Sequence, residues 1–404
     1  MKLRVSMAAV ALTALVAAGC GSSSSSSSSS SSASASTKAA ASGSSGRKCV
    51  ASIAIEGPFT GPVAQVGLEQ LHFAQLAVAD DNAANHTNVT IAQDDTQLTP
   101  SIAVAKTQSI IATNAVGVVG PAGSQEVEAV GPLMGKAGLA FISGSATLPA
   151  LASDGKNPTF FRVVPDDNVQ GPQDANYIVI HLKPKAVLII DDDEAYSQGL
   201  VNVMTPILKK AGIKVNHQTL NGSDTGATLA NAIKSLVTSQ LNPAETVTVV
   251  PWQAATSAQQ FGLDAKQQGK KTILFGTDGT NSPTQFTIPG TYVSAFGPDI
   301  STSTSTLDQS IVKGVAKYGP YGSFGLPTYE AADVLIKAIA SVCQGGQSPS
   351  RSNVLAAVKK TNIAASANPL GIPVAFASNG DLAGDYGYLF KISSAGKYVE
   401  IPPK

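Results

Sequence analysis

The sequence predicts an α/β protein with two Rossmann-like lobes, each a parallel sheet flanked by helices. From residue 50 onward, short β-branched runs alternate with amphipathic stretches. Strands that are apolar on both faces and separated by helices are typical of parallel sheets covered on both sides. The alternation breaks once, around residues 160–168, and then resumes. About 355 residues follow the N-terminal segment, which is enough chain for two domains.

The first cycle of the alternation predicts the first lobe. In residues 65–80, Leu68, Leu71, Ala74 and Val78 form one apolar stripe, as expected of a helix that packs on a sheet. The expected strands are 50–55, 89–93, 116–119 and 139–142, and the expected helices are 65–80, 101–113 and 125–136.

The second cycle predicts the second lobe. Residues 160–168 are expected to cross between the lobes, because an apolar run is followed there by a polar one. The expected strands are 186–190, 213–216, 246–250 and 272–275, and the expected helices are 171–181, 196–210, 226–238 and 254–268. Helices are then expected at 307–317 and 329–342, and edge strands within 386–392.

The N-terminus predicts export and a lipid anchor. A basic start is followed by an apolar run too short to span a bilayer, and small residues precede Cys20. Residues 1–19 are therefore interpreted as a lipoprotein signal peptide, with Cys20 as the lipidated first residue. Residues 20–48 are rich in serine and are expected to form a flexible tether. An ordinary secretory signal that ends nearby is the alternative, because Ala17 is less typical than leucine at its position.

Composition argues against nucleic acid as a partner. The chain has 27 basic and 27 acidic residues, and no basic cluster that could neutralise phosphates. Besides Cys20 there are two cysteines, Cys49 and Cys343. In an oxidising compartment this pair is compatible with a disulfide, and two buried free thiols are the alternative.

The sequence contains no recognisable catalytic motif. Neither Ser124 nor Ser145 stands in the G-x-S-x-G setting of an exposed nucleophile, and no phosphate-binding glycine motif occurs. The four histidines are scattered without metal-ligand spacing. We therefore expect a binding site without a cofactor or metal. In parallel sheets such sites lie beyond the carboxyl ends of the strands. The loops singled out for this reason are 57–66, 120–124, 143–147, 191–196, 251–255 and 276–280.

An ordered set of short motifs resembles the leucine/isoleucine/valine-binding proteins of ABC importers. It extends from about residue 50 to residue 392, nearly all of the chain expected to fold, and only the set as a whole is specific. The motifs are EGPFTGPVAQ at 56–65, GPAGS at 120–124, ISGSAT at 142–147, QGP at 170–172, YSQGL at 196–200, GTDG at 276–279, TYEAA at 328–332 and NGDL at 379–382.

The resemblance implies the type I periplasmic-binding-protein fold, with two lobes joined by a three-strand hinge. Lobe 1 is then expected to contain residues 49–163 and 299–366, and lobe 2 residues 164–298 and 367–404. It also implies a monomer that captures an amino acid by hinge closure and delivers it to an ABC permease. A receptor for amides, aromatic acids or other small polar solutes, and a sensor for a signalling partner, are the alternatives.

The same resemblance assigns roles to individual residues. It implies that Ser124 and Thr147 bind the α-carboxylate of an amino acid, with Ser145 offering backbone groups. It places Asp278 against the ammonium group and Tyr196 over the ligand. Helix N-capping is the alternative for Ser124 and Thr147.

The walls of the pocket depart from the family pattern. Phe324 matches a side-chain contact from the first lobe, but Val66 stands where the family usually has an aromatic residue. Asp278 stands where glutamate is frequent. Trp252 is either a wall of the ligand site or part of the core, and Gln253 lies where a second-lobe aromatic is usual.

Overall fold

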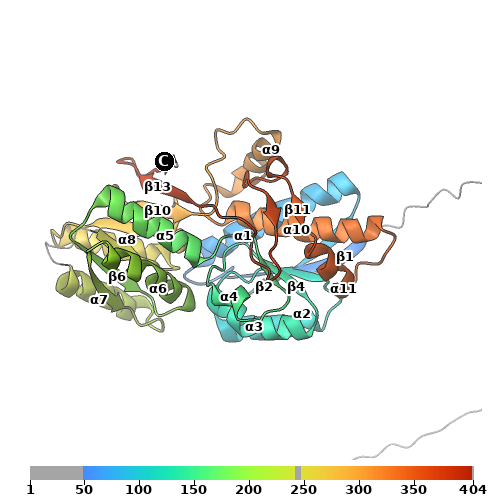
Figure 1. Ribbon diagram of the computed structural model, residues 1–404, viewed down its shortest axis with the longest axis horizontal. Helices are drawn as coiled ribbons and strands as arrows, with labels where there is room; N and C mark the ends of the chain where they lie inside the picture. The colour runs from blue at the N-terminus through green and yellow to red at the C-terminus, as the bar shows by residue number, and fades with distance from the viewer. Residues whose placement is uncertain (1–48, 242–246, 403–404) are drawn as a thin grey trace, which may run out of the picture. The chain divides into compact units, whose positions relative to one another are not determined.

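The computed structural model describes residues 49–241 and 247–402, and confirms the predicted α/β class with sheets flanked by helices (Figure 1). The expected signal peptide, Cys20 and the serine-rich tether lie outside the described residues. None of the helices within the described ranges is both long and apolar enough to cross a membrane.

The first sheet has five strands in the order β2-β1-β3-β4-β5, and every neighbouring pair is parallel. Alternate side chains of β1 enter different cores: Ile53 and Ile55 face one side of the sheet, and Ala54 faces the other. The strands are β1 (Val50–Gly57), β2 (Asn88–Asp95), β3 (Gly117–Val119), β4 (Ala140–Ser143) and β5 (Phe160–Arg162). Because both faces are covered, the runs are apolar rather than alternating.

Helices cover both faces of this sheet. One core joins β1, β3 and β4 to α1, α9, α10 and α11, and the other joins the opposite face to α2 and α3. The helices are α1 (Ala64–Asn85), α2 (Pro100–Ile111), α3 (Ser124–Lys136), α4 (Ala150–Ser153), α9 (Thr306–Val315), η3 (Ala316–Tyr318), α10 (Gly325–Gln344) and α11 (Arg351–Val358). Helices from beyond residue 300 therefore complete the first lobe.

The second sheet has seven strands in the order β14-β13-β10-β9-β8-β6-β7. The strands are β6 (Ala186–Asp191), β7 (Lys214–Thr219), β8 (Val247–Val250), β9 (Ile273–Gly276), β10 (Tyr292–Ala295), β13 (Tyr388–Ile392) and β14 (Tyr398–Ile401). From β7 to β10 the pairs are parallel, whereas β13 and β14 are antiparallel. The expectation of edge strands within 386–392 was therefore wrong for β13, because β14 pairs with its outer side and forms the edge of the sheet.

Helices also cover both faces of the second sheet. Leu188 and Ile190 of β6 pack with α7 and α8, and Val187 and Ile189 pack with α5 and α6. The helices are α5 (Asp167–Tyr177), η1 (Ile178–Leu182), α6 (Ala195–Lys210), α7 (Gly226–Gln240), α8 (Ala255–Gln267) and η2 (Asp278–Thr280).

Three chain crossings connect the lobes and share a small apolar cluster. Val164, Phe296 and Tyr386 belong to the three crossings, and they pack around Phe324 and Val66. The hydroxyl of Tyr386 also donates a hydrogen bond to the carbonyl of Val163 at 2.8 Å. This cluster ties the third crossing to the first.

The last crossing lies later in the chain than the sequence implied. Residues 367–382 were assigned to lobe 2, but Leu370, Val374 and Leu382 are buried in the first-lobe core. The segment contains β12 (Val374–Ala375), which pairs with β11 (Asn362–Ile363); η4 (Ala365–Ala367) lies between the two strands. The residues stay with lobe 1 because this small antiparallel pair covers the apolar surface beside α10 and α11.

Cys49 and Cys343 form a disulfide in the structure. It joins the residue before β1 to the last turn of α10, which are 294 residues apart in the chain. The bond therefore holds the C-terminal part of lobe 1 to its first strand.

Candidate functional site

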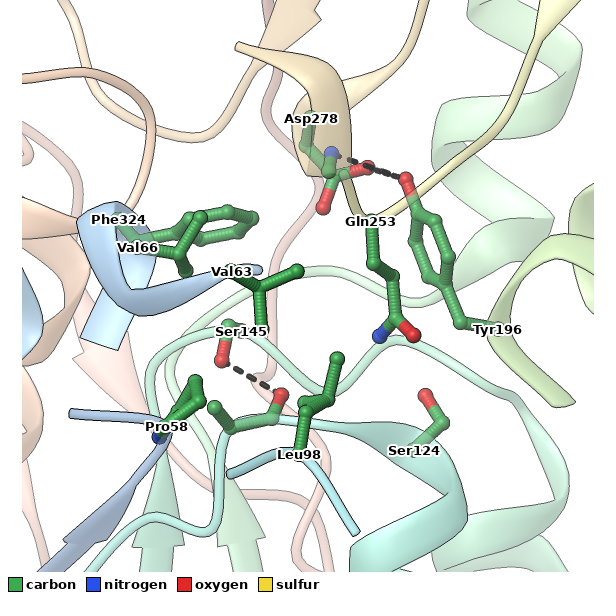
Figure 2. Close-up of a pocket in the computed structure, with 12 residues that line it drawn as sticks. Pro58, Val63, Val66, Leu98, Ser124, Ser145, Tyr196, Gln253, Asp278 and Phe324 are labelled. Atoms are coloured by element: carbon green, nitrogen blue, oxygen red, sulfur yellow. Dashed lines mark hydrogen bonds between the residues drawn. The ribbon is translucent and has the colours of Figure 1, made fainter. Parts of the chain in front are cut away.

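A cavity between the lobes is lined by residues from both of them (Figure 2). It contains about 360 Å³ of space between atoms, including open solvent at its mouth. The lining residues are Pro58, Val63, Val66, Leu98, Ala122, Ser124, Ser145, Tyr196, Gln253, Asp278, Gly279 and Phe324.

The sheet topology explains why these residues meet. Pro58 follows β1, Ser124 follows β3, Ser145 follows β4, and Asp278 follows β9. The carboxyl ends of parallel strands lie at one edge of a sheet, so the loops after them converge on one crevice. The structure brings together six of the eight ligand-contact residues expected from sequence: Val66, Ser124, Ser145, Tyr196, Asp278 and Phe324.

Asp278 supplies a buried carboxylate to the cavity. Its side chain is only 1% exposed. Oδ1 accepts hydrogen bonds from the Tyr196 hydroxyl and from Nε2 of Gln170, both at 2.6 Å. In Figure 2 the other carboxylate oxygen points toward the cavity. The carboxylate is thus held on one side by the protein and faces the cavity on the other.

Burial raises the pKa of Asp278 to about 6, although the hydrogen bonds from Tyr196 and Gln170 oppose this effect. A carboxyl group that leaves water favours its neutral form unless a positive charge accompanies it. A cationic group of a ligand would supply that charge and lower the pKa again.

Tyr196 is fixed as firmly as Asp278. Its hydroxyl accepts a hydrogen bond from the backbone amide of Gly279 at 3.0 Å and lies 2.7 Å from the hydroxyl of Thr277. A side chain on Gly279 would also be too close to the Tyr196 ring, since a Cβ there would lie 3.0 Å from Cε1. Tyr196 therefore stands between the GTDG loop and the cavity.

A chain of buried polar groups supports Asp278 from behind. Nε2 of Gln170 also donates to the Ser294 hydroxyl at 2.9 Å, and Ser294 donates to Asp174 at 2.8 Å. Burial raises the pKa of Asp174 well above its ordinary value. These hydrogen bonds connect α5 and β10 to the acid of the pocket.

Ser124 presents its hydroxyl at the start of α3. Its Oγ accepts a hydrogen bond from the amide of Leu148 at 3.2 Å, and this contact leaves the hydroxyl proton for another acceptor. The N-cap of α3 is Gly123, whose amide donates to Glu126 at 2.9 Å. Ser124 is thus the first residue of the helix and not its side-chain cap.

Ser145 is mainly a link between loops. Its hydroxyl donates to the Ala122 carbonyl and accepts from Nε2 of Gln70, both at 2.8 Å. Its backbone amide donates to Oγ of Ser143 at 3.2 Å. Of the backbone groups that Ser145 was expected to offer, the amide is therefore engaged within its own loop.

Thr147 lies beside the first crossing and is not among the residues that line the cavity. Its carbonyl accepts a hydrogen bond from the amide of Asp167, the first residue of α5, at 3.0 Å. Burial raises the pKa of Asp167 to about 8, and the Thr147 hydroxyl partly opposes this shift. The structure thus places Thr147 between the serine loop and the hinge. Its N-capping alternative is also absent, because the N-cap of α4 is Pro149.

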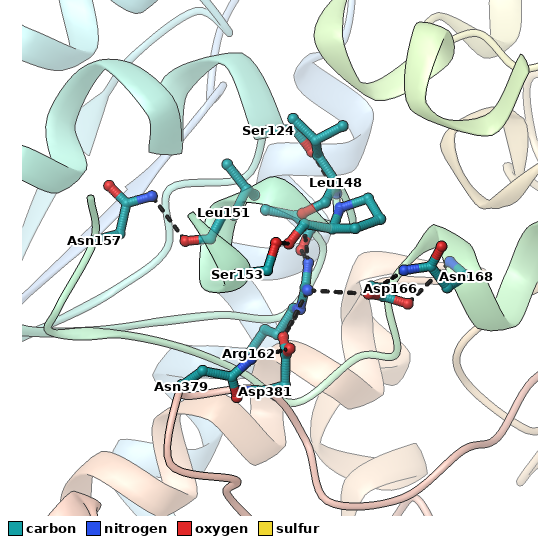
Figure 3. A network of polar contacts seen from close by, with 12 residues as sticks. Ser124, Leu148, Leu151, Ser153, Asn157, Arg162, Asp166, Asn168, Asn379 and Asp381 are labelled. Carbon is teal, nitrogen blue, oxygen red and sulfur yellow. Dashed lines mark hydrogen bonds and ion pairs between the residues drawn. The ribbon is translucent and has the colours of Figure 1, made fainter. Parts of the chain in front are cut away.

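Arg162 holds the loop that carries Thr147 (Figure 3). Its guanidinium donates to the carbonyls of Ala146 at 3.3 Å and Leu148 at 2.9 Å. It also pairs with Asp381 at 2.6 Å. Since the Leu148 amide binds Ser124, Arg162 indirectly positions the serine hydroxyl.

Part of the cavity is lined by apolar side chains. In Figure 2, Val63, Val66 and Phe324 lie on one side, and Tyr196 and Gln253 lie on the other. Glu69 positions Phe324, because its carboxylate accepts hydrogen bonds from the amides of Phe324 at 2.9 Å and Gly325 at 2.6 Å. The cavity can therefore accept a molecule with a charged or polar head and an apolar tail.

Trp252 is a core residue in this structure. It is 1% exposed, its ring packs edge-on against Phe261 at 6.0 Å, and it belongs to the core shared with α7 and α8. Of the two interpretations left open by the sequence, the structure supports core packing.

The sequence analysis missed Leu98 as a lining residue. The loop after β2 was not singled out, although it follows a parallel strand as the others do. Its place directly after a parallel strand is the sequence feature that could have identified this loop. Pro58, Val63 and Ala122 also line the cavity; they lie in loops that the sequence analysis singled out, but none had been given a role there.

Gln253 makes a contact across the crevice. Nε2 of Gln125, on α3, donates to Oε1 of Gln253 at 2.9 Å, while the Gln253 amide donates to Asp192 at 3.2 Å. The two lobes are therefore hydrogen-bonded to each other beside the cavity.

Comparisons with known proteins agree with this geometry. A family model described as periplasmic binding protein matches residues 51–397. A leucine-, isoleucine-, valine-, threonine- and alanine-binding protein of Pseudomonas aeruginosa is 28% identical over 298 residues, which cover 71% of this chain and 77% of that protein. Other curated relatives, such as the Leu/Ile/Val-binding protein of Citrobacter freundii, match over 45% of their length.

Solved structures share the fold. The branched-chain amino acid transporter substrate-binding protein LivJ of Streptococcus pneumoniae, in complex with isoleucine, has a TM-score of 0.74 at 20% identity, covering 87% of this chain and 100% of that one. The leucine-binding protein LivK of Thermotoga maritima has a TM-score of 0.75 at 18% identity, covering 87% and 98%. The chain is a solute-binding protein and belongs to the periplasmic binding protein family, with the type I fold of the leucine/isoleucine/valine-binding proteins.

Proposed function

We propose that this protein binds a small amino acid with an aliphatic side chain between its lobes and delivers it to an ABC importer. The observation that carries the proposal is the buried Asp278 carboxylate, which faces a cavity with Ser124 at one end and apolar side chains at the other. The chain is expected to act outside the cytoplasmic membrane, anchored through lipid on Cys20.

Charge complementarity supports a zwitterionic ligand. An ammonium group that leaves water needs an anion, and Asp278 is an anion whose ionised form is disfavoured by burial. A carboxylate needs hydrogen-bond donors, and the Ser124 hydroxyl retains its proton for this purpose. One ligand with both groups would satisfy both needs at once.

Hinge closure is needed to reach useful affinity. An amino acid with a leucine-sized side chain has about nine heavy atoms, and micromolar binding requires about −8 kcal/mol. This is near 0.9 kcal/mol per atom, which demands that almost the whole ligand be enclosed. Because Ser124 and Asp278 belong to different lobes, both can contact one ligand only when the lobes are together. The Gln125–Gln253 hydrogen bond supports this proposal, because it joins the two lobes beside the crevice.

Isothermal titration calorimetry would test this function. The mature chain would be titrated with aliphatic amino acids, and with matched carboxylic acids and amides that lack one end of the zwitterion. We expect aliphatic amino acids to bind at micromolar concentration, and both truncated series to bind at least tenfold more weakly. Preferential binding of the carboxylic acids or the amides would contradict the role given to Asp278 or Ser124.

Small-angle X-ray scattering on the same samples would test closure, because a ligand that joins the lobes should reduce the radius of gyration. An unchanged scattering curve at saturation would contradict hinge closure. Recovery of the ligand unaltered would distinguish a receptor from an enzyme.

A further inference from the structure

Leu98 reaches the cavity from an unusual backbone conformation. Its φ is +57°, and the preceding Gln97 has φ +53°. Neither residue is glycine, and two consecutive non-glycine residues in the left-handed region are disfavoured. Such conformations persist only where the surrounding structure imposes them, and they concentrate at functional sites.

Asp95 imposes this conformation. Its Oδ1 accepts hydrogen bonds from the amides of Phe59 at 2.8 Å, Thr60 at 3.2 Å and Gln97 at 3.1 Å. Its Oδ2 accepts from the Thr60 hydroxyl at 2.5 Å. The amide of Thr96 also donates to the Gly57 carbonyl at 2.9 Å. Asp95 thus joins the loop after β2 to the loop after β1, and both loops line the cavity.

The side chain of Leu98 occupies space beside the binding groups. It lines the cavity with Pro58, Val63 and Val66. It also packs against the start of α3, because a Cβ on Gly123 would lie only 2.8 Å from Cδ1 of Leu98. Leu98 is therefore a wall between the apolar end of the cavity and the segment that carries Ser124.

We propose that Leu98 sets the length of the aliphatic side chain that the pocket accepts. This inference rests on the proposed function and adds the determinant of its specificity. Because the Asp95 hydrogen bonds fix the backbone, this loop cannot shift away from the cavity to admit a longer ligand as a free loop could. Truncation of Leu98 to alanine removes the Cγ methine and both Cδ methyl groups, and should therefore lengthen the pocket.

The test measures affinity along a graded series for the mature wild type and Leu98→Ala. The amino acids are alanine, 2-aminobutyrate, norvaline and norleucine, and the matched carboxylic acids and amides are titrated in parallel. A buried methylene contributes about a fourfold gain in affinity. We expect the preferred length to increase by at least one carbon in Leu98→Ala. We also expect the norleucine-to-alanine affinity ratio to rise at least tenfold.

Two further variants separate pocket shape from backbone strain. Gln97→Gly relieves a similar positive φ at an exposed residue that does not line the cavity, and it should leave the ranking of ligands unchanged. Leu98→Gly relieves strain and removes the wall, and it should rank the ligands as Leu98→Ala does. Thermal melting of each variant shows that it is folded, and because Leu98 is only partly buried we expect folding to be retained.

Each outcome bears on the inference. An unchanged ranking in Leu98→Ala, or an equal shift in Gln97→Gly, would overturn it while amino-acid binding by the wild type still supported the proposed function. If only the carboxylic acids or only the amides bind, the proposed function is wrong, and the length dependence within that series still tests Leu98. If no series binds, both are overturned.

Discussion

Replacement of Asp278 by asparagine should stabilise the ligand-free protein while abolishing its function. Asparagine keeps an oxygen that can accept the hydrogen bonds from Tyr196 and Gln170 at 2.6 Å, but it carries no charge. A ligand ammonium would then be buried without an anion. Loss of one partner of a buried charge pair costs about 3–5 kcal/mol, so we expect affinity to fall at least about 100-fold.

The gain in stability follows from the pKa of the carboxyl group. Burial raises the pKa of Asp278 to about 6, above its ordinary value of 3.8. Ionising Asp278 therefore costs more in the folded chain than in the unfolded chain. Below about pH 4 the carboxyl group is protonated in both states and does not lower the free energy of unfolding. The folded state loses this advantage as the pH rises through about 6. Above pH 7 the difference amounts to about 3 kcal/mol, which the neutral asparagine avoids.

Urea unfolding followed by tryptophan fluorescence measures this effect. Trp252 is the only tryptophan of the chain and is buried in the second lobe, which also carries Asp278. At pH 7.5, Asp278→Asn should raise the free energy of unfolding by up to about 3 kcal/mol, and near pH 4 the two proteins should be nearly equal. Asp385→Asn, at an exposed acid, controls for the change in net charge. Equal destabilisation of Asp278→Asn at both pH values would refute the reasoning.

Three other outcomes are expected. Amino-acid affinity of the wild type should fall about tenfold per pH unit below pH 6, because Asp278 takes up a proton and no longer pairs with the ammonium. Calorimetry at pH 7 and pH 5 measures this change. An affinity that does not depend on pH would exclude Asp278 as the partner of the ammonium. Gln125→Ala should lower amino-acid affinity about threefold to tenfold, because it removes the hydrogen bond to Gln253 across the crevice. The melting temperature of the ligand-free protein should change little. An unaltered affinity would show that this contact does not stabilise the closed form. Arg162→Ala should lower the free energy of unfolding by about 3–5 kcal/mol, as measured by urea unfolding. The substitution leaves Asp381 without its buried partner, and the carbonyls of Ala146 and Leu148 without their hydrogen-bond donor. A decrease below about 1 kcal/mol would contradict the role of this network.

Much of the fold follows from local patterns. Leu71, Ala74 and Val78 of the expected stripe are buried in α1, whereas Leu68 is exposed, and the expected strand at 186–190 is β6. These elements are long or strongly patterned, so burial of one face determines them. The strands β5, β10 and β14 and the pair β11–β12 were not predicted. Each is only two to four residues long, too short to show a clear period.

Candidate site residues were predictable where a motif follows a strand. Ser124 and Asp278 follow β3 and β9, and topology alone brings such loops together. The roles of Trp252 and Thr147 depended on side-chain direction, which the spacing of residues does not encode. The structure turns Trp252 into the second-lobe core and sets Thr147 beside α5.

The sequence by itself determined the α/β class, the longer helices and strands and the loops that carry hydroxyl and acidic groups, because these depend on neighbouring residues. Tertiary structure alone decided that Leu98 is a wall of the cavity, that Gln253 meets Gln125, and that the last crossing follows residue 382. Each of these depends on contacts between residues far apart in the chain, and the free energy of such contacts is set by packing rather than by local pattern.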